Sequence, residues 1–346
     1  MGAVPGAARP MSAPTQNGGW RRFLLPVARH EEVGLLLLFL LVAAFFVIAT
    51  PSARSASTFL DLLRDVSPNL IAAVGLTLLL LSGELDLSIG SMLAFTGVAT
   101  VTIFNATGNM WLGILGGLLT GPLVGAINGY LVCVQGMNSL MTTLGTMFTL
   151  RGLVYVWTNK TPVVDEHQFT AFTNFWQSDF LFVPLPGILA LVIIALAWLM
   201  VTRTEFGRNI YAIGGNATAA RVSGIHVGRN RFVLFVLSGT TAAVAGLLVA
   251  SQTGTGYFDA GVQGFELIVI ASAVLGGVSL SGGQGNLVSS MLGVLILGMT
   301  AKGLRLLGVH TTQQLVITGL VMLIAVYLHG ARQRLLAESR TWEEGS

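Results

Sequence analysis

The chain has 346 residues, of which 53% are hydrophobic and only 10% are charged, and its mean hydropathy is +0.77. This composition excludes a soluble globular protein of this length and predicts a polytopic membrane protein. The net charge of +3 is small and the arginines lie in particular loops and tails, so the isoelectric point near 9.3 reflects membrane topology rather than nucleic-acid binding.

The first segments of the chain predict a tail followed by a membrane span. Residues 1–30 begin with a stretch rich in Gly, Ala, Pro and Ser that lacks apolar periodicity, so we expect a disordered cytoplasmic tail. Residues 33–49 are long for a signal-peptide core and lack a small-residue cleavage site, which predicts an uncleaved first span. Residues 59–65 (FLDLLRD) mix leucines with charged side chains, a pattern typical of a short helix lying on the membrane.

Further apolar segments predict the other spans, although several are shorter than the roughly twenty residues that a crossing helix needs. They lie at residues 66–81, 88–104, 111–134, 140–157, 185–201, 232–250, 265–278, 287–304 and 314–328. The count is about ten, so the predicted fold is an all-α integral membrane protein whose membrane domain occupies residues 31–330. An even count places both termini in the cytoplasm, with residues 331–346 as a C-terminal tail.

Glycine and aromatic residues mark three special regions. Residues 254–264 and 277–285 interrupt apolar runs with glycines, so we expect broken or re-entrant helices whose backbone is covered by protein or faces water. Residues 159–186 form the longest loop on the face opposite to the cytoplasm. The aromatic residues of this loop predict an ordered element that faces a partner, or an aromatic belt at the lipid headgroups.

The long polar interruption at residues 202–231 carries five arginines and a single acid, Glu205. Loops of this kind stay in the cytoplasm, so the segment orients the whole protein. Within it, NATAARVS at residues 216–223 predicts a short helix with Asn216 as its N-cap and Gly224 as its stop. Such a helix suits docking on a partner, and the alternative that charge alone favours is an ordinary topogenic loop.

Two motifs carry a resemblance to a known family. GRNIYAIGGNATAARVSGI at residues 207–225 resembles the cytoplasmic coupling loop of permease subunits from ribose-type ABC importers, a family that also includes xylose, arabinose, galactofuranose and autoinducer-2 permeases. SGELDLSIGSMLA at residues 82–94 resembles the other signature of that family. The similarity covers about residues 59–330, and it departs from many sugar permeases at Glu84, where they have a second glycine.

The resemblance implies an importer subunit in the bacterial cytoplasmic membrane. It implies a dimer of identical or different permease subunits that docks on two ATPase subunits, with an extracytoplasmic binding protein delivering the solute. The expected solute is a monosaccharide. A nucleoside, autoinducer-2 or a branched-chain amino acid remains an alternative within the class, and a self-sufficient secondary carrier is the alternative from another class.

Two groups of residues are candidates for function. The candidate coupling residues are Gly215, Asn216, Ala219, Ala220, Arg221, Ser223 and Gly224. The candidate path or gating residues are Asn69, Glu84, Asp86, Ser88, Asn128, Asn138, Thr142 and Thr143. A carboxylate at membrane depth normally pairs, caps a helix or lines water, and we expect Asp86 to cap the helix that starts near Ile89. Neutral polar groups can exchange hydrogen bonds with sugar hydroxyls, although interhelical bonding is the alternative for each.

The sequence also lacks the motifs of several enzyme classes. The only lysines are Lys160 and Lys302, and neither follows the glycines of a phosphate-binding P-loop, so we expect ATP and Mg²⁺ to be bound by a partner ATPase. The five histidines are scattered without metal-ligand spacing. We therefore expect a transporter subunit with no catalytic site and no cofactor of its own.

Overall fold

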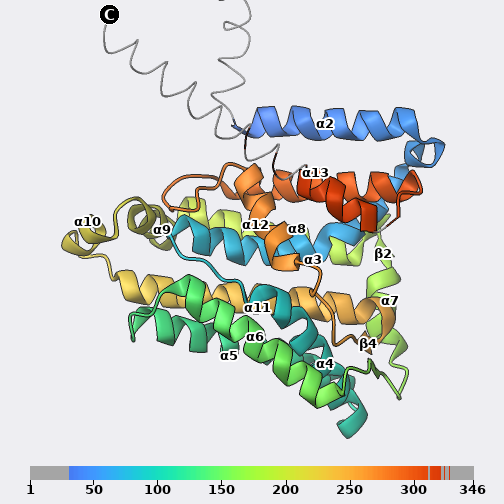
Figure 1. The fold of residues 1–346 in the computed structure, drawn as a ribbon, viewed down its shortest axis with the longest axis horizontal. Coiled ribbons are helices and arrows are strands. Elements are labelled where there is room, and N and C mark those ends of the chain that lie inside the picture. Colours follow the sequence, from blue (N-terminus) through green and yellow to red (C-terminus); the bar gives the residue numbers. More distant parts are fainter. Residues whose placement is uncertain (1–30, 311, 321–322, 324–326, 328–346) are drawn as a thin grey trace, which may run out of the picture.

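The structure is a computed structural model, and it describes residues 31–310, 312–320, 323 and 327 (Figure 1). The predicted tails, residues 1–30 and 331–346, lie outside the described residues, and so does part of the predicted span at residues 314–328.

The described chain is almost entirely helical. The helices are α2 Glu31–Ala49, α3 Ala56–Leu81, α4 Ile89–Thr107, α5 Met110–Cys133, α6 Ser139–Thr158, α7 Thr170–Gln177, α8 Leu185–Arg203, α9 Glu205–Gly215, α10 Ala217–Val222, α11 Val227–Thr253, α12 Phe265–Leu275 and α13 Leu287–Leu306. A short 3-10 helix, Pro51–Arg54, joins α2 to α3. Among the described residues, seven helices (α2, α3, α4, α5, α8, α11 and α13) are long and apolar enough to cross a membrane. The prediction of an all-α membrane protein is confirmed, and the count of about ten spans stays a prediction.

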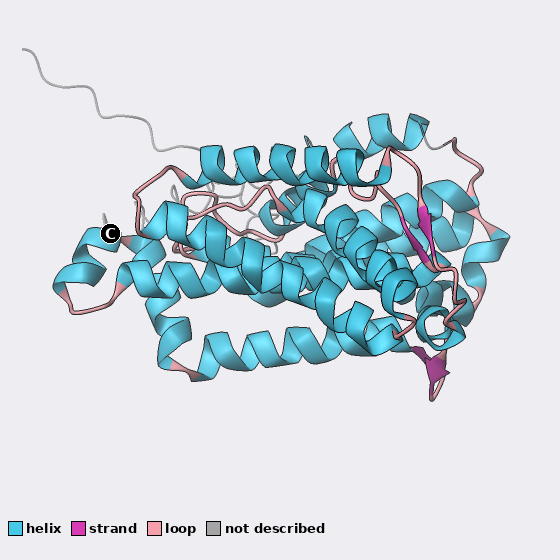
Figure 2. Ribbon diagram, turned by 90° about the horizontal axis from the view of Figure 1, so that it is seen from below, coloured by secondary structure: helices cyan, strands magenta, loops and turns pink. Residues whose placement is uncertain are grey.

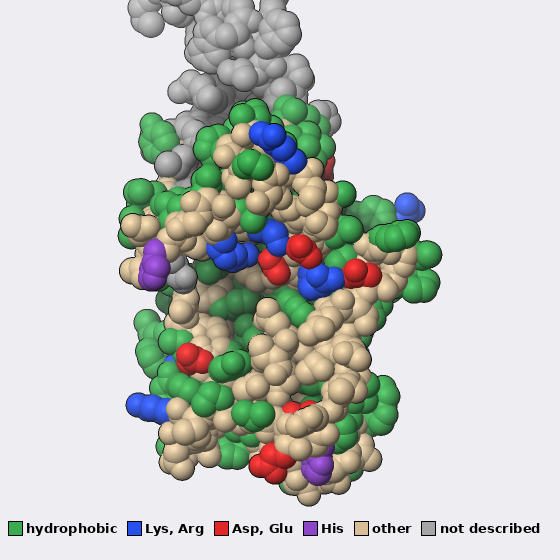
Figure 3. Space-filling view, turned by 90° about the vertical axis from the view of Figure 1, so that its right-hand side faces the viewer, with side chains coloured by type: hydrophobic (Ala, Val, Ile, Leu, Met, Phe, Trp, Pro, Cys, Tyr) green, Lys and Arg blue, Asp and Glu red, His purple; other side chains and the backbone are tan. Residues whose placement is uncertain are grey.

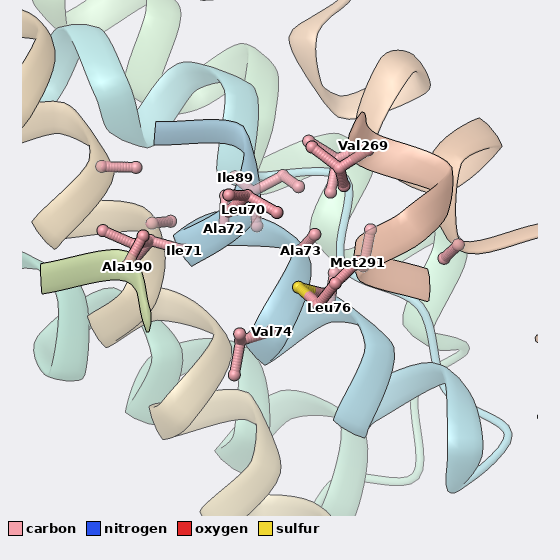
Figure 4. Packing of buried hydrophobic residues seen from close by; sticks show 14 of the residues in the cluster. Leu70, Ile71, Ala72, Ala73, Val74, Leu76, Ile89, Ala190, Val269 and Met291 are labelled. Atoms are coloured by element: carbon pink, nitrogen blue, oxygen red, sulfur yellow. The ribbon is translucent and has the colours of Figure 1, made fainter. Parts of the chain in front are cut away.

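Helix α3 forms the centre of the molecule. It packs against α8, α11, α12 and α13, and nearly every side chain of its second half is buried. Figure 4 shows its apolar side chains meeting Ala190 of α8, Val269 of α12 and Met291 of α13. The peripheral helices α2 and α5 instead expose rows of leucines, as helices facing lipid do.

Glycines inside the spans allow helix backbones to approach closely. Gly121 of α5 faces Gly239 of α11, and a Cβ atom added to Gly121 would lie only 2.5 Å from the Gly239 carbonyl oxygen. Small residues at such crossings stabilise helix pairs in lipid through direct packing.

The predicted surface helix at residues 59–65 is wrong, because this segment belongs to the first turns of α3. Its charged residues form ion pairs within α3 and with α13. Arg64 pairs with Asp61 (Nη1 to Oδ1, 2.9 Å), and Asp65 pairs with Lys302 of α13 (Oδ2 to Nζ, 3.0 Å). Pairing with residues distant in the sequence lets these charges lie on a long helix.

Non-helical backbone occupies both predicted breaks. Helix α11 ends at Gly254, which has a left-handed backbone (φ 65°), and α12 begins only at Phe265. After α12, the chain is irregular until α13. The break after α11 contains β4, Thr255–Gly256, which pairs with β1, Val163–Val164.

The two ends of the helical body differ, and we name them after their helices. The α10 end consists of α9, α10 and their connections, on the left of Figure 1. The α7 end, on the right, consists of α7 and the four short strands, which Figure 2 also shows at one end of the molecule. The strands β2, Asp179–Phe180, and β3, Val183–Pro184, form a hairpin there.

The loop at residues 159–186 is ordered, as predicted, but several of its aromatic rings are core residues. Phe172 and Trp176 of α7 are buried, and Phe169 and Phe172 each pack edge-on against Phe104 of α4. The aromatic-belt alternative is therefore wrong for these rings. Phe180 and Phe182 remain exposed.

Candidate functional site

The short helix predicted at residues 216–223 is present as α10. The Asn216 side-chain oxygen accepts a hydrogen bond from the Ala219 amide at 2.9 Å, so Asn216 caps the helix as predicted. Gly224 follows the helix with φ 87°, a left-handed conformation that favours glycine. Local sequence therefore determines where this helix begins and ends.

Helix α10 is fixed to the protein on one side and exposed on the other. Ala220 is buried against Ile213 of α9 and Val227 of α11. The other candidate coupling residues are exposed: Gly215, Asn216, Ala219, Arg221, Ser223 and Gly224. Val222, which the sequence analysis did not single out, is 85% exposed. The exposed side of α10 therefore presents an apolar and a basic side chain next to each other.

Helix α9 links α10 to the membrane helices. Its residues Ile210 and Ile213 are buried, which gives the helix one apolar face toward the protein. The Tyr211 hydroxyl donates a hydrogen bond to the Gly285 carbonyl oxygen at 3.1 Å. Burial raises the pKa of Tyr211, which favours the neutral phenol that donates this bond.

Four glycines bring three distant segments into backbone contact next to α9. We call Gly83, Gly214, Gly282 and Gly283 the glycine junction. The Gly283 amide donates to the carbonyl oxygen of Leu81, the last residue of α3, at 2.9 Å.

No larger residue fits at the centre of the glycine junction. A Cβ atom on Gly214 would clash with the Leu81 oxygen and the Gly283 nitrogen, and one on Gly282 would lie 2.7 Å from the Gly83 nitrogen. The end of α9 therefore rests directly on the end of α3 and on the break before α13. A displacement of α9 acts on both membrane segments without a flexible side chain between them.

Beside the glycine junction, an ion pair joins the motif at residues 82–94 to the start of α11. Arg231, in the second turn of α11, pairs with Glu84 (Nη1 to Oε1, 2.6 Å) and donates from Nη2 to the Ser82 carbonyl oxygen at 2.9 Å. Both side chains are largely shielded from solvent, since 23% of Arg231 and 11% of Glu84 are exposed. Charge-assisted bonds in such surroundings are stronger than surface ion pairs.

Asp86 is the centre of a buried polar cluster, which we call the Asp86 network. Its Oδ1 accepts from the Ser88 amide at 2.9 Å and the Ser88 hydroxyl at 2.6 Å, and its Oδ2 accepts from the Ser238 hydroxyl at 2.9 Å. Asn128 donates to the Ser88 hydroxyl oxygen at 3.1 Å and accepts from Thr146 at 2.6 Å. The network ties the segment before α4 to α5, α6 and α11.

The predicted cap at Asp86 is wrong. Ser88 precedes α4 and makes no side-chain cap to it, and Asp86 bonds to Ser88 rather than to an amide inside the helix. The carboxylate instead satisfies donors from two segments, which is how a charge at membrane depth avoids isolation.

The other candidate path residues are distributed between this region and the α7 end. Thr143 accepts from the Leu87 amide at 3.1 Å, Asn138 caps α6, and Thr142 bonds back to the Asn138 carbonyl oxygen. Asn69 lies apart from them, half-buried on α3. Whether these residues line a solute path stays a prediction.

Comparisons with known proteins identify the family. The family model described as "Branched-chain amino acid transport system / permease component" matches residues 58–326. The ribose import permease protein RbsC of Escherichia coli K12 is 35% identical over 92% of this chain and 99% of its own length. The ribose import permease protein RbsC of Bacillus subtilis 168 is 38% identical over 86% of this chain and 90% of the relative's own length.

The L-arabinose transport system permease protein AraH of Escherichia coli K12 is 36% identical over 88% of this chain and 92% of its own length. No solved structure matches the chain. Because the family model covers most of the chain and these relatives align along nearly their whole length, the chain belongs to this family of multi-pass membrane permeases, the branched-chain amino acid transport system permease components.

Proposed function

We propose that the chain is the membrane-spanning subunit of an ATP-binding-cassette importer that moves a monosaccharide across the bacterial cytoplasmic membrane. The similarity to ribose and arabinose permeases supports the solute class. The exposed helix α10 contacts the glycine junction through α9, and this contact is the observation that supports the coupling mechanism. Members of this family are transporter components rather than enzymes, and in this proposal the partner ATPases bind ATP and Mg²⁺.

The proposed orientation places the α10 end in the cytoplasm. Residues 202–231 hold five arginines and one acid, which supports this side for the loop. With about ten spans, both termini are then cytoplasmic, and the α7 end faces the solute-binding protein. A second permease subunit, identical or different, completes the pathway in this proposal.

Coupling proceeds through contacts that are already in place. An ATPase that grips the exposed side of α10 moves α9, because Ala220 packs on Ile213 of α9. Helix α9 moves the end of α3 and the break before α13 through the glycine junction, and Arg231 holds the segment at Glu84. To switch the permease between two states, the ATP-bound partner must favour one of them by several kcal/mol, about 5.5 kcal/mol for a nearly complete switch.

Two alternatives differ in what drives transport or what is transported. A nucleoside, autoinducer-2 or a branched-chain amino acid would use the same coupling, and the family description names the last of these. A secondary carrier would need ion-coupling groups in the membrane and no partner at α10. The exposure of Arg221 and Val222 on a rigidly seated helix favours a docked partner.

The test is ATP hydrolysis and uptake by the reconstituted complex of this chain, its ATPase and its binding protein. We expect ATP hydrolysis that rises when the binding protein carries one pentose or hexose, and uptake of the same sugar into proteoliposomes. Uptake driven by an ion gradient without any ATPase would reject the importer in favour of the carrier.

A further inference from the structure

The α7 end contains a cavity of about 470 Å³ that is lined by residues of neither the glycine junction nor the Asp86 network. Figure 3 looks onto this end and shows a hollow with basic and acidic side chains along one edge. The volume lies within the roughly 300–1,000 Å³ of small-molecule sites. Its polar and aromatic lining residues are Asp65, Asn69, Trp176, Gln252, Phe265 and Arg305.

Six helices meet at the cavity, and α4 contributes Leu93. Asp65 and Asn69 come from α3, Trp176 from α7, Gln252 from α11, Phe265 from the start of α12, and Arg305 from the end of α13. At the opposite end of the molecule, the glycine junction contacts the end of α3 and includes the break between α12 and α13. The lining therefore belongs to the helices that coupling would move.

The charged side chains of the lining are engaged in ion pairs. Asp65 accepts from Arg305 at 3.3 Å and from Lys302 at 3.0 Å. Neighbouring Arg64 is likewise shared between Asp61 and Asp179, at 2.9 and 2.5 Å. With both signs present and paired, the cavity offers no isolated charge to an anion or a cation.

The uncharged polar groups of the lining are available to a ligand. Within the described part of the chain, no side-chain hydrogen bond involves the amide of Asn69 or Gln252 or the indole of Trp176. An amide offers donors and an acceptor together, which matches a hydroxyl that is also both. The rings of Trp176 and Phe265 add flat apolar surfaces beside these groups.

We propose that this cavity is the receiving site for an uncharged polyhydroxylated solute of about pentose or hexose size, entering from the α7 end. Hydroxyls pair with Asn69 and Gln252, and the C–H face of the ring lies on Trp176 or Phe265. The inference rests on the proposed function, and it adds the position of the site and the neutrality of its ligand. A branched-chain amino acid suits the site poorly, because its ammonium and carboxylate would meet charges that are already paired.

The first experiment probes binding by thiol protection in the reconstituted complex. Cys133 is the only cysteine, so Val249→Cys in a Cys133→Ala background carries one thiol, at a lining position to which no hydrogen bond with the solute is assigned. We expect a membrane-impermeant thiol reagent to modify it, and the transported sugar to slow the modification. Leucine and the phosphate ester of the same sugar should give no protection. The matched control is Gln263→Cys in the same background, at an exposed position outside the lining, whose modification should be indifferent to sugar.

The second experiment adds Asn69→Ala to the Val249→Cys protein. Loss of one hydrogen bond should raise the sugar concentration for half-protection by roughly two- to tenfold. Asn174→Ala, an exposed asparagine of α7 outside the lining, should leave that concentration unchanged. Recovery of each variant in the intact complex with its ATPase excludes a folding defect.

The outcomes separate this inference from the proposed function. If the complex with Val249→Cys still transports a sugar that fails to protect its thiol, the cavity is not the receiving site, although the importer function stands. Protection by leucine instead of any sugar overturns the neutral-ligand class. Absence of sugar uptake and of sugar-stimulated hydrolysis in the wild-type complex overturns the proposed function itself.

Discussion

Arg231 of α11 and Glu84 of the segment after α3 form an ion pair with 2.6 Å between Nη1 and Oε1. The pair joins the motif at residues 82–94 to α11, the helix that follows the coupling loop. It lies beside the glycine junction, since the same guanidinium bonds to the Ser82 carbonyl oxygen. A movement of the coupling loop is therefore transmitted to the segment between α3 and α4 by a charge-assisted contact.

Removal of one partner of this pair should weaken the protein. Arg231→Gln leaves the Glu84 carboxylate shielded and unpaired, which should lower the free energy of unfolding by about 1–3 kcal/mol. The measurement is the thermal unfolding of the purified permease in detergent. Arg229→Gln is the matched control, because Arg229 is exposed on the same helix and forms no ion pair within the described residues. Equal midpoints for the two variants would contradict the role assigned to the pair.

Alanine at Gly214 of the glycine junction should destabilise the protein, whereas alanine at the neighbouring Gly215 should not. Gly214→Ala places a Cβ against the Leu81 oxygen and the Gly283 nitrogen, so we expect a loss of about 1–3 kcal/mol through overpacking. Gly215→Ala is the control, since nothing lies within 4 Å of a Cβ there. Thermal unfolding of the two variants compares them directly, and tolerance of alanine at position 214 would show that the three segments do not meet as described.

The Asp86 network should contribute to stability as a unit. Asp86→Ala removes the acceptor of three hydrogen bonds, from the Ser88 amide, the Ser88 hydroxyl and the Ser238 hydroxyl. With these donors buried, we expect a loss of roughly 3 kcal/mol or more. Asp259→Ala, at an exposed position, should change the unfolding midpoint little. A stable Asp86→Ala protein that fails only in transport would instead favour a role for Asp86 in the solute path.

The sequence predicted features whose causes lie within a few residues. Asn216 and Gly224 mark the two ends of α10 through contacts inside one helical turn. Their roles could therefore be predicted from the local sequence. The pairing of Arg231 with Glu84 joins residues far apart in the chain, and nothing in either motif names its partner. The same reason explains the error at residues 59–65, where Asp65 and its neighbours suggested a surface helix because their partner Lys302 lies on α13.

Buried polar residues were the hardest to assign from sequence. Asp86 was predicted to cap the next helix, and the structure places it among donors from two segments, one of them Ser238 of α11, which the sequence analysis passed over. The residues that line the cavity were equally hard to predict from the sequence. Asn69 was a candidate, but Trp176 was one ring among many in an aromatic loop, and Gln252 lies at the end of an ordinary apolar helix.

The central claim is that α10 transmits the ATPase cycle to the membrane helices, and Arg221→Glu tests it most directly. Arg221 is exposed and forms no ion pair among the described residues, so reversal of its charge should leave the protein folded. The measurement is ATP hydrolysis by the reconstituted complex with sugar-loaded binding protein, for wild type, Arg221→Glu and the control Arg208→Glu on α9. The account predicts that Arg221→Glu abolishes stimulation while wild type and the control keep it. Unchanged stimulation in Arg221→Glu, with the protein folded in the membrane, would contradict it.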